Sequence, residues 1–236
     1  MEKLFGSRKA NLEDGEHWMS ISDLMSGLMI VFLFVSIAMM HFVRVERDRI
    51  KEIAMAYRET QVNLYNDLQV EFSGDLKSWG AEIDKETLEV RFLNPEFLFN
   101  SGRSDLRPSF KQVLDNFFPR YLSVIFRYQE RIDEIRIEGH TSSDWAQGVS
   151  VENAYFHNMS LSQSRTREVL QYVHSLASSE ADRDWIRRKI AAVGFSSART
   201  VQKIAGGEDA HRSRRVSFRV ISDSATQIKR IINDGP

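Results

Sequence analysis

Residues 24–40 read LMSGLMIVFLFVSIAMM and carry no charged side chain. Residues 18–23 before this run and 41–43 after it extend it into a longer, mostly apolar segment. The hydrocarbon core of a bilayer is about 30 Å thick and needs about 20 mostly apolar helical residues to cross it. The sequence therefore predicts a transmembrane helix over residues 18–43, preceded by a tail at 1–17.

A cleaved signal peptide is the alternative for this run. Its apolar core would usually be shorter, about 7–15 residues, and small residues for cleavage would follow it. Here the run leads instead into the charged residues Arg44, Glu46 and Arg47. We therefore expect the helix to stay in the membrane.

The flanking charges leave the direction of crossing open. Three basic residues precede the segment, between 3 and 9, and four follow it, between 44 and 51. The positive-inside rule favours a cytoplasmic C-terminal side, but long domains cross largely regardless of charge. The direction of crossing must therefore be inferred from the kind of C-terminal domain that the chain carries.

Residues 44–79 are polar and contain no proline. Apolar side chains recur in this stretch at spacings close to a heptad, at Ile50, Ile53, Tyr57, Leu64 and Leu68. The pattern predicts a helical juxtamembrane linker. This helix is either paired with a second copy of the chain or laid as a single amphipathic helix on its own domain.

From residue 80 onwards the pattern alternates between strands and helices. Side chains alternate as in half-buried strands over 87–93, 132–138, 190–195 and 215–221. Pro108 opens one helix, because proline costs little at an early helical position. Ser160 or Ser162 caps a second helix. This order predicts an α/β sandwich at 80–224, with helices on one face of a mixed sheet and a tail at 225–236.

Composition argues against several functions. Lys plus Arg number 32 and Asp plus Glu number 33, so the balance gives no support to a nucleic-acid partner. Without cysteine there is neither a disulfide nor a Cys-ligated metal site. His140, Ser142 and Asp144 alternate at one strand end and do not form a nucleophile–base chain. We expect no enzymatic activity, no metal and no cofactor.

Four segments of the C-terminal part resemble the OmpA-like, peptidoglycan-binding domain of MotB-type proteins. In chain order they are FLFNSGRSDLRP at 97–108, IEGHTSSD at 137–144, NMSLSQSRTREVLQYV at 158–173 and SRRVSFRV at 213–220. A fifth, WMSISDLM at 18–25, resembles the entry to the membrane helix of MotB-type stator subunits. The resemblance implies a single-pass protein of the bacterial inner membrane, with a cytoplasmic N-terminus and a periplasmic C-terminal domain.

Asp23 lies in the first turns of the expected membrane helix. A carboxylate at the centre of a membrane helix costs about 2.5–3.5 kcal/mol on insertion scales, so it protonates, pairs or faces a wet cavity. A helix N-cap is the alternative role for this residue. The resemblance makes Asp23 the ion-translocating group. A lone carboxylate suits H⁺, whereas Na⁺ wants further oxygen ligands, of which Ser22 and Ser26 offer some.

One helix cannot enclose an ion path, so the resemblance implies a multi-pass partner of the MotA or ZorA kind. It also implies a second copy of this chain, as a homodimer. Ser22, Ser26 and Gly27 are small enough for close helix packing in such a channel. A membrane-to-wall tether without ion flow is the rival interpretation, and it has no use for Asp23.

The resemblance also implies a peptidoglycan site. Arg165 would hold the diaminopimelate carboxylate, because a planar guanidinium forms two charge-assisted hydrogen bonds. Asn158 would hydrogen-bond the peptide stem, with Leu161 as its apolar neighbour. Thr141 is a further, backbone-side contact.

One position departs from the family pattern. Ser142 stands where the family has an aspartate after Gly-His-Thr, and Asp144 is the candidate to replace that carboxylate. Within the family, the compact linker and the long loop after Thr141 resemble the ZorB branch, which belongs to Zorya anti-phage systems. A flagellar MotB-type stator subunit is the alternative.

Overall fold

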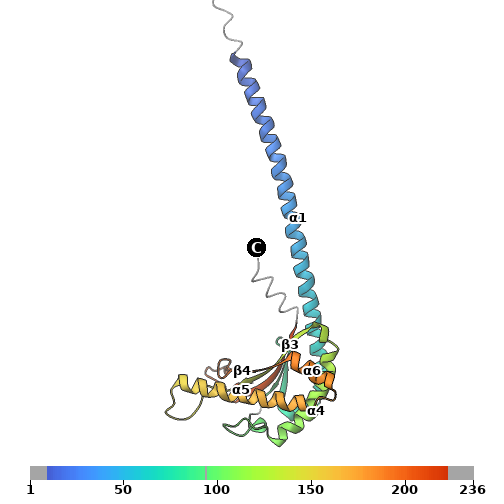
Figure 1. The fold of residues 1–236 in the computed structure, drawn as a ribbon. Coiled ribbons are helices and arrows are strands. Elements are labelled where there is room, and N and C mark those ends of the chain that lie inside the picture. The colour runs from blue at the N-terminus through green and yellow to red at the C-terminus, as the bar shows by residue number, and fades with distance from the viewer. Residues whose placement is uncertain (1–9, 94, 223–236) are drawn as a thin grey trace, which may run out of the picture. The chain divides into compact units, whose positions relative to one another are not determined.

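The computed structural model describes residues 10–93 and 95–222 (Figure 1). The chain divides into two compact units, Met1–Glu52 and Ile53–Pro236. The expected tail at 225–236, and residues 1–9 of the expected tail at 1–17, lie outside the described residues.

Helix α1 (Ala10–Phe72) begins in the first unit and ends in the second. Its apolar stretch reaches a mean hydropathy of 2.3, and none of it is buried within the chain. Phe32 and Phe34, for example, expose 62% and 67% of their surface. Such a surface is costly in water but suits lipid, so the prediction of one long apolar N-terminal helix is confirmed.

The second unit is built on a five-stranded sheet with the order β1-β2-β5-β3-β4. Its strands are β1 (Ala81–Asp84), β2 (Glu89–Phe92), β3 (Ile132–His140), β4 (Ile190–Gly194) and β5 (Arg215–Ser222). The β3–β4 pair is parallel and the other pairs are antiparallel. The sheet is therefore mixed, as predicted.

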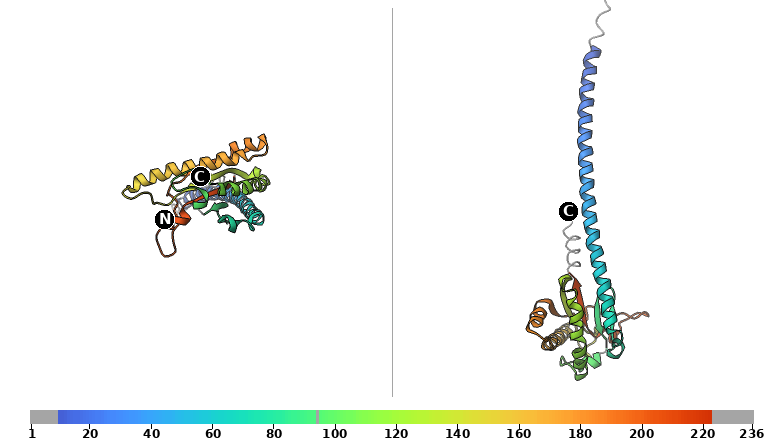
Figure 2. Two further views of the ribbon diagram at one scale, coloured as in Figure 1. Left: turned by 90° about the horizontal axis from the view of Figure 1, so that it is seen from below. Right: turned by 90° about the vertical axis from the view of Figure 1, so that its right-hand side faces the viewer.

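Helices α4 and α5 pack on one face of this sheet (Figures 1 and 2). The helices of this unit are α2 (Leu76–Trp79), α3 (Pro95–Leu98), α4 (Pro108–Phe126), α5 (Val151–Ser175), α6 (Glu180–Lys189) and α7 (Ala210–Ser213), with a 3-10 turn at Gln129–Arg131. Pro108 stands at the start of α4, as predicted. The expected α/β arrangement, with helices on one face, is confirmed.

Aromatic rings fill the core between α4 and the sheet. The Phe117 ring of α4 lies 5.2 Å from both Phe92 of β2 and Phe218 of β5, centroid to centroid. Both contacts are edge-on, the geometry that the ring quadrupole favours. All three side chains are fully buried, so the inward positions of β2 and β5 hold the helix in place.

The C-terminal end of α1 belongs to the same core. Leu64, Leu68 and Phe72 are at most 1% exposed and lie in the cluster that α4 and the sheet share. Arg120 of α4 holds this end: its Nε donates to Glu71 at 2.7 Å, and its guanidinium lies 4.9 Å above the Phe72 ring. For Leu64 and Leu68, the heptad-like seam is therefore an amphipathic face laid on its own domain.

One local prediction needs correction, and two elements were missed. α5 begins at Val151 and is capped by Ser150, whose Oγ accepts from the Asn153 N–H at 3.3 Å. The expected caps, Ser160 and Ser162, lie inside the helix. Strand β1 and helix α6 were not expected at all, because each is short and buries few side chains.

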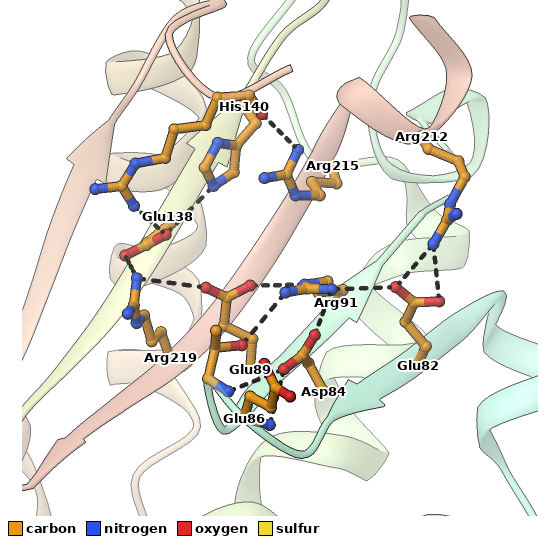
Figure 3. A network of polar contacts seen from close by, with 12 residues as sticks. Glu82, Asp84, Glu86, Glu89, Arg91, Glu138, His140, Arg212, Arg215 and Arg219 are labelled. Atoms are coloured by element: carbon orange, nitrogen blue, oxygen red, sulfur yellow. Dashed lines mark hydrogen bonds and ion pairs between the residues drawn. The ribbon is translucent and has the colours of Figure 1, made fainter. Parts of the chain in front are cut away.

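The other face of the sheet carries a network of charges (Figure 3). Glu138 of β3 is fully buried and lies within 3.8 Å of His140, Arg199 and Arg219. A buried carboxylate is costly unless it is paired. Burial raises the pKa of Glu138, but the close contact with the His140 ring and the arginine cations outweigh it and hold the pKa below its usual range.

Candidate functional site

A pocket of about 480 Å³ opens where β3 ends. It gathers residues from the loop after β3, from α5 and from the segment between α3 and α4. All five residues predicted to bind a ligand line it, namely Thr141, Asp144, Asn158, Leu161 and Arg165. Phe99, Trp145 and Arg214 also line it. Side chains that are far apart in the sequence therefore meet at one site.

Two glycines allow α5 to approach the sheet closely. Gly139 of β3 and Gly194 of β4 stand opposite each other in the parallel pair. A Cβ on Gly139 would lie 2.7 Å from the Thr166 side chain, and one on Gly194 would lie 2.5 Å from the Gln163 backbone nitrogen. Since neither glycine has a Cβ, the helix packs directly on the strands and presents Asn158 and Arg165 at the strand ends.

Asn158 is 3% exposed, and its side chain contacts the loop that follows β3. Its side-chain amide donates to the backbone carbonyls of Ser142 and Asp144, both at 3.2 Å. The amide therefore fixes the path of the loop that leaves β3. The Ser143 backbone N–H and side chain also contact the Glu208 carboxylate, which holds the outer side of the same loop.

Thr141 and the departure at Ser142 lie at the base of the pocket. The Thr141 N–H donates to the Ser196 carbonyl at 2.9 Å, whereas its buried hydroxyl has no hydrogen-bond partner among the described residues. Ser142 is 5% exposed, and Asp144, two residues on, is exposed and lines the pocket. The pocket therefore offers a free hydroxyl and one carboxylate.

Arg165 brings a cation without a counter-ion to this pocket. Its Nε donates to the Arg103 carbonyl at 2.9 Å, and its guanidinium lies 4.7 Å from the centre of the Phe99 ring. No described carboxylate lies within ion-pair distance of it. Burial, together with the nearby Arg214 cation, lowers the pKa of Arg165 to about 10, so the group remains charged at neutral pH.

This arrangement suits an anionic, hydrogen-bonding ligand. A half-buried cation that faces carbonyls and an aromatic ring has no counter-charge, and a ligand carboxylate would supply one. Phe99 lies inside the motif at 97–108, but the resemblance gave it no role in the site. Trp145 follows directly after the motif at 137–144 and lies outside every motif. No group of three or more potential metal-ligating side chains occurs in the described part of the chain.

The predicted membrane-helix residues belong to the other unit. Ser22, Asp23, Ser26 and Gly27 are all exposed on α1, and the Ser26 hydroxyl donates to the Ser22 carbonyl at 2.8 Å. A Cβ on Gly27 would meet nothing within 4 Å, so the helix surface is open at this point. Asp23 and Gly27 are one turn apart, within reach of one neighbouring helix.

Comparison with solved structures defines the class. A MotB-like protein from Desulfovibrio vulgaris superposes with a TM-score of 0.50 at 22% identity, covering 72% of this chain and 94% of that one. The periplasmic domain of Helicobacter pylori MotB matches with a TM-score of 0.43 at 12% identity, over 66% of this chain and 92% of its own. No protein-family model matches the chain. The C-terminal unit has the fold of the MotB-like protein.

The sequence identifies the branch. The Zorya protein ZorB of Escherichia coli, strain Crooks, is 52% identical over 235 residues, which span 99% of this chain and 100% of that protein. The chain belongs to the ZorB family. The sequence patterns left the Zorya and the flagellar branch open. This identity supports the Zorya branch.

Proposed function

We propose that this chain is a stator subunit of an ion-driven complex, held to the cell wall by its C-terminal domain. The observation that carries the proposal is the uncompensated Arg165 cation in a pocket on a MotB-like fold. The pocket is the anchor, and the apolar helix with Asp23 is the ion-carrying element. In this arrangement the N-terminus is cytoplasmic and the domain lies in the periplasm, beyond the bacterial inner membrane.

The ligand of the pocket is the peptide stem of peptidoglycan. Its diaminopimelate carboxylate binds Arg165, and the free Thr141 hydroxyl donates to the stem. Asp144 takes the ligand's amino group, in place of the carboxylate that Ser142 lacks. Leu161 covers the methylene chain, and Asn158 acts through the loop that it holds.

Ion transport runs through Asp23, with H⁺ as the ion. The carboxylate is neutralised when a proton enters from one side and is ionised again when the proton leaves to the other. A single helix leaves this group facing lipid, so a multi-pass partner of the ZorA or MotA kind supplies the rest of the path. The Escherichia coli relative is named as a Zorya protein, and this name supports anti-phage defence as the output.

Two copies of the chain form the stator core. Leu64 and Leu68 are buried in their own domain, so the contact between copies runs along α1 before them. Ile50, at 38% exposed, and the half-buried Ile53 and Tyr57 are the available part of the seam. Ser22, Ser26 and Gly27 allow close packing within the membrane.

Sedimentation with purified cell-wall sacculi tests the anchor. The full-length protein in detergent should pellet with sacculi, and Arg165→Ala should weaken binding about ten- to a hundredfold, because a charged hydrogen bond is worth about 1.5–3 kcal/mol. Arg167→Ala is the matched control, since Arg167 is on the same helix with its side chain 72% exposed. Wild-type protein that stays in the supernatant would refute the proposal, as would equal pelleting of the Arg165 variant.

A further inference from the structure

A second hollow, of about 450 Å³, adjoins the pocket. Gly102, Trp145 and Leu161 line both hollows, so the two form one groove that passes over α5. Arg165 lines only the first hollow. A ligand that fills the groove therefore places its anion at one end and a different chemical group at the other.

Trp145 stands between the two ends as a fixed aromatic surface. Its ring is stacked on His157 of α5, with centroids 5.2 Å apart and an angle of 18° between the planes. It remains 41% exposed, which is unusual for so large an apolar side chain. The loop that carries it is tied down by Asn158 and by Glu208. The indole is thus presented to a ligand with little conformational entropy left to lose.

The walls of the second hollow are neutral and rich in hydroxyl groups. Ser104, Ser160 and Ser164 line it. Its charged residues, Arg103 and Asp105, form an ion pair with each other at 2.7 Å, so neither charge needs a charged ligand to compensate it. A flat aromatic ring beside several hydroxyls suits a sugar, whose ring has an apolar C–H face and a rim of hydroxyl and amide groups.

We propose that the second hollow binds an N-acetylhexosamine of the glycan strand, with the apolar face of the sugar on Trp145. The inference rests on the proposed function, because the peptide stem is attached to this sugar and a stem at Arg165 brings the sugar alongside. The site then recognises the junction between peptide and glycan. It therefore binds intact cell wall in preference to free peptide.

Calorimetric titration of the full-length protein in detergent tests this with two probes. One is the free tripeptide L-Ala–D-Glu–meso-diaminopimelate, and the other is the same peptide attached to its N-acetylglucosaminyl–N-acetylmuramyl disaccharide. We expect the wild type to prefer the second probe about tenfold, as an aromatic contact of ordinary strength gives. Trp145→Ala should reduce this preference to less than about twofold.

Phe156→Ala is the matched control, because Phe156 is an exposed aromatic residue on α5 that lines neither hollow. It should leave the preference unchanged. Equal wild-type affinities for the two probes would overturn the sugar site and leave the anchor intact, as would an undiminished preference in the Trp145 variant. Binding of neither probe would overturn the proposed function, and the sugar site with it.

Discussion

Two half-buried arginines of this domain are held in opposite ways. Arg91 of β2 lies within 2.9 Å of both Asp84 and Glu89, so its charge is compensated inside the sheet network (Figure 3). Arg165 faces backbone carbonyls and an aromatic ring instead. Leaving a cation unpaired costs stability, and such a cost is expected where a ligand supplies the missing charge.

His140 couples the network to pH. Burial of its ring, with the Arg215 cation nearby, holds the pKa of His140 below its usual range even though Glu138 and Glu89 oppose this. The native state therefore takes up fewer protons than the unfolded state, and stability is fully present above about pH 6.5 and lost as the pH falls. The low pKa of Glu138 acts in the same direction, but only below about pH 4.5.

We predict that the melting temperature of the full-length protein in detergent falls between pH 7.5 and pH 5.5. Tryptophan fluorescence of the buried Trp79 and Trp185 reports the transition. His140→Gln should flatten this dependence, because glutamine does not titrate. A variant with the full wild-type pH dependence would show that another group is responsible.

The five residues predicted to bind the ligand line one pocket, but the contacts that Asn158 makes there were not predicted. The motif match put Arg165 and Asn158 in one pocket, since a motif fixes spacing along a helix. It did not reveal that the Asn158 amide holds the carbonyls of Ser142 and Asp144, because the path of that loop depends on contacts with Glu208, far along the chain.

At the scale of elements, the placement of the pocket depends on the contact between α5 and the β3–β4 pair. Gly194→Ala should destabilise the domain by about 1–3 kcal/mol, because the new Cβ would overlap the Gln163 backbone, and backbone cannot yield cheaply. The melting temperature and sacculus binding should both fall. Gly74→Ala is the control, since a Cβ there meets nothing within 4 Å. Unchanged melting of the Gly194 variant would mean that the helix does not pack this closely.

The errors in predicting elements also have physical causes. The first two turns of α5 bury only the small Ala154 and the polar Asn158, whereas Val151 is 88% exposed and Phe156 62%. Helical periodicity is therefore visible only farther along, which led to Ser160 or Ser162 as the cap. Strand β1 buries one residue, Ile83, and gives no alternation that a short window can detect.

At the scale of the whole molecule, the sequence predicted the order of membrane helix, linker and α/β domain. The expected domain start at residue 80 omits Leu64, Leu68 and Phe72, which the structure buries in the domain core. Each such side chain contributes about 1.5–3 kcal/mol of burial free energy, so the end of α1 is an integral part of the fold. A heptad-like seam cannot distinguish packing on a partner from packing on its own domain.

We infer that this chain is anchored to the cell wall and carries ions through Asp23. The most direct test of this inference is proton uptake by proteoliposomes that contain the purified complex with its multi-pass partner, under an imposed membrane potential. Each charge then gains about 2.3 kcal/mol per 100 mV, which drives the flow. Asp48→Asn is the control, since Asp48 is an exposed carboxylate of α1 beyond the apolar run. We predict uptake by the wild type and the control, and none above background for Asp23→Asn. Wild-type uptake by the Asp23 variant would contradict the account and leave a structural tether.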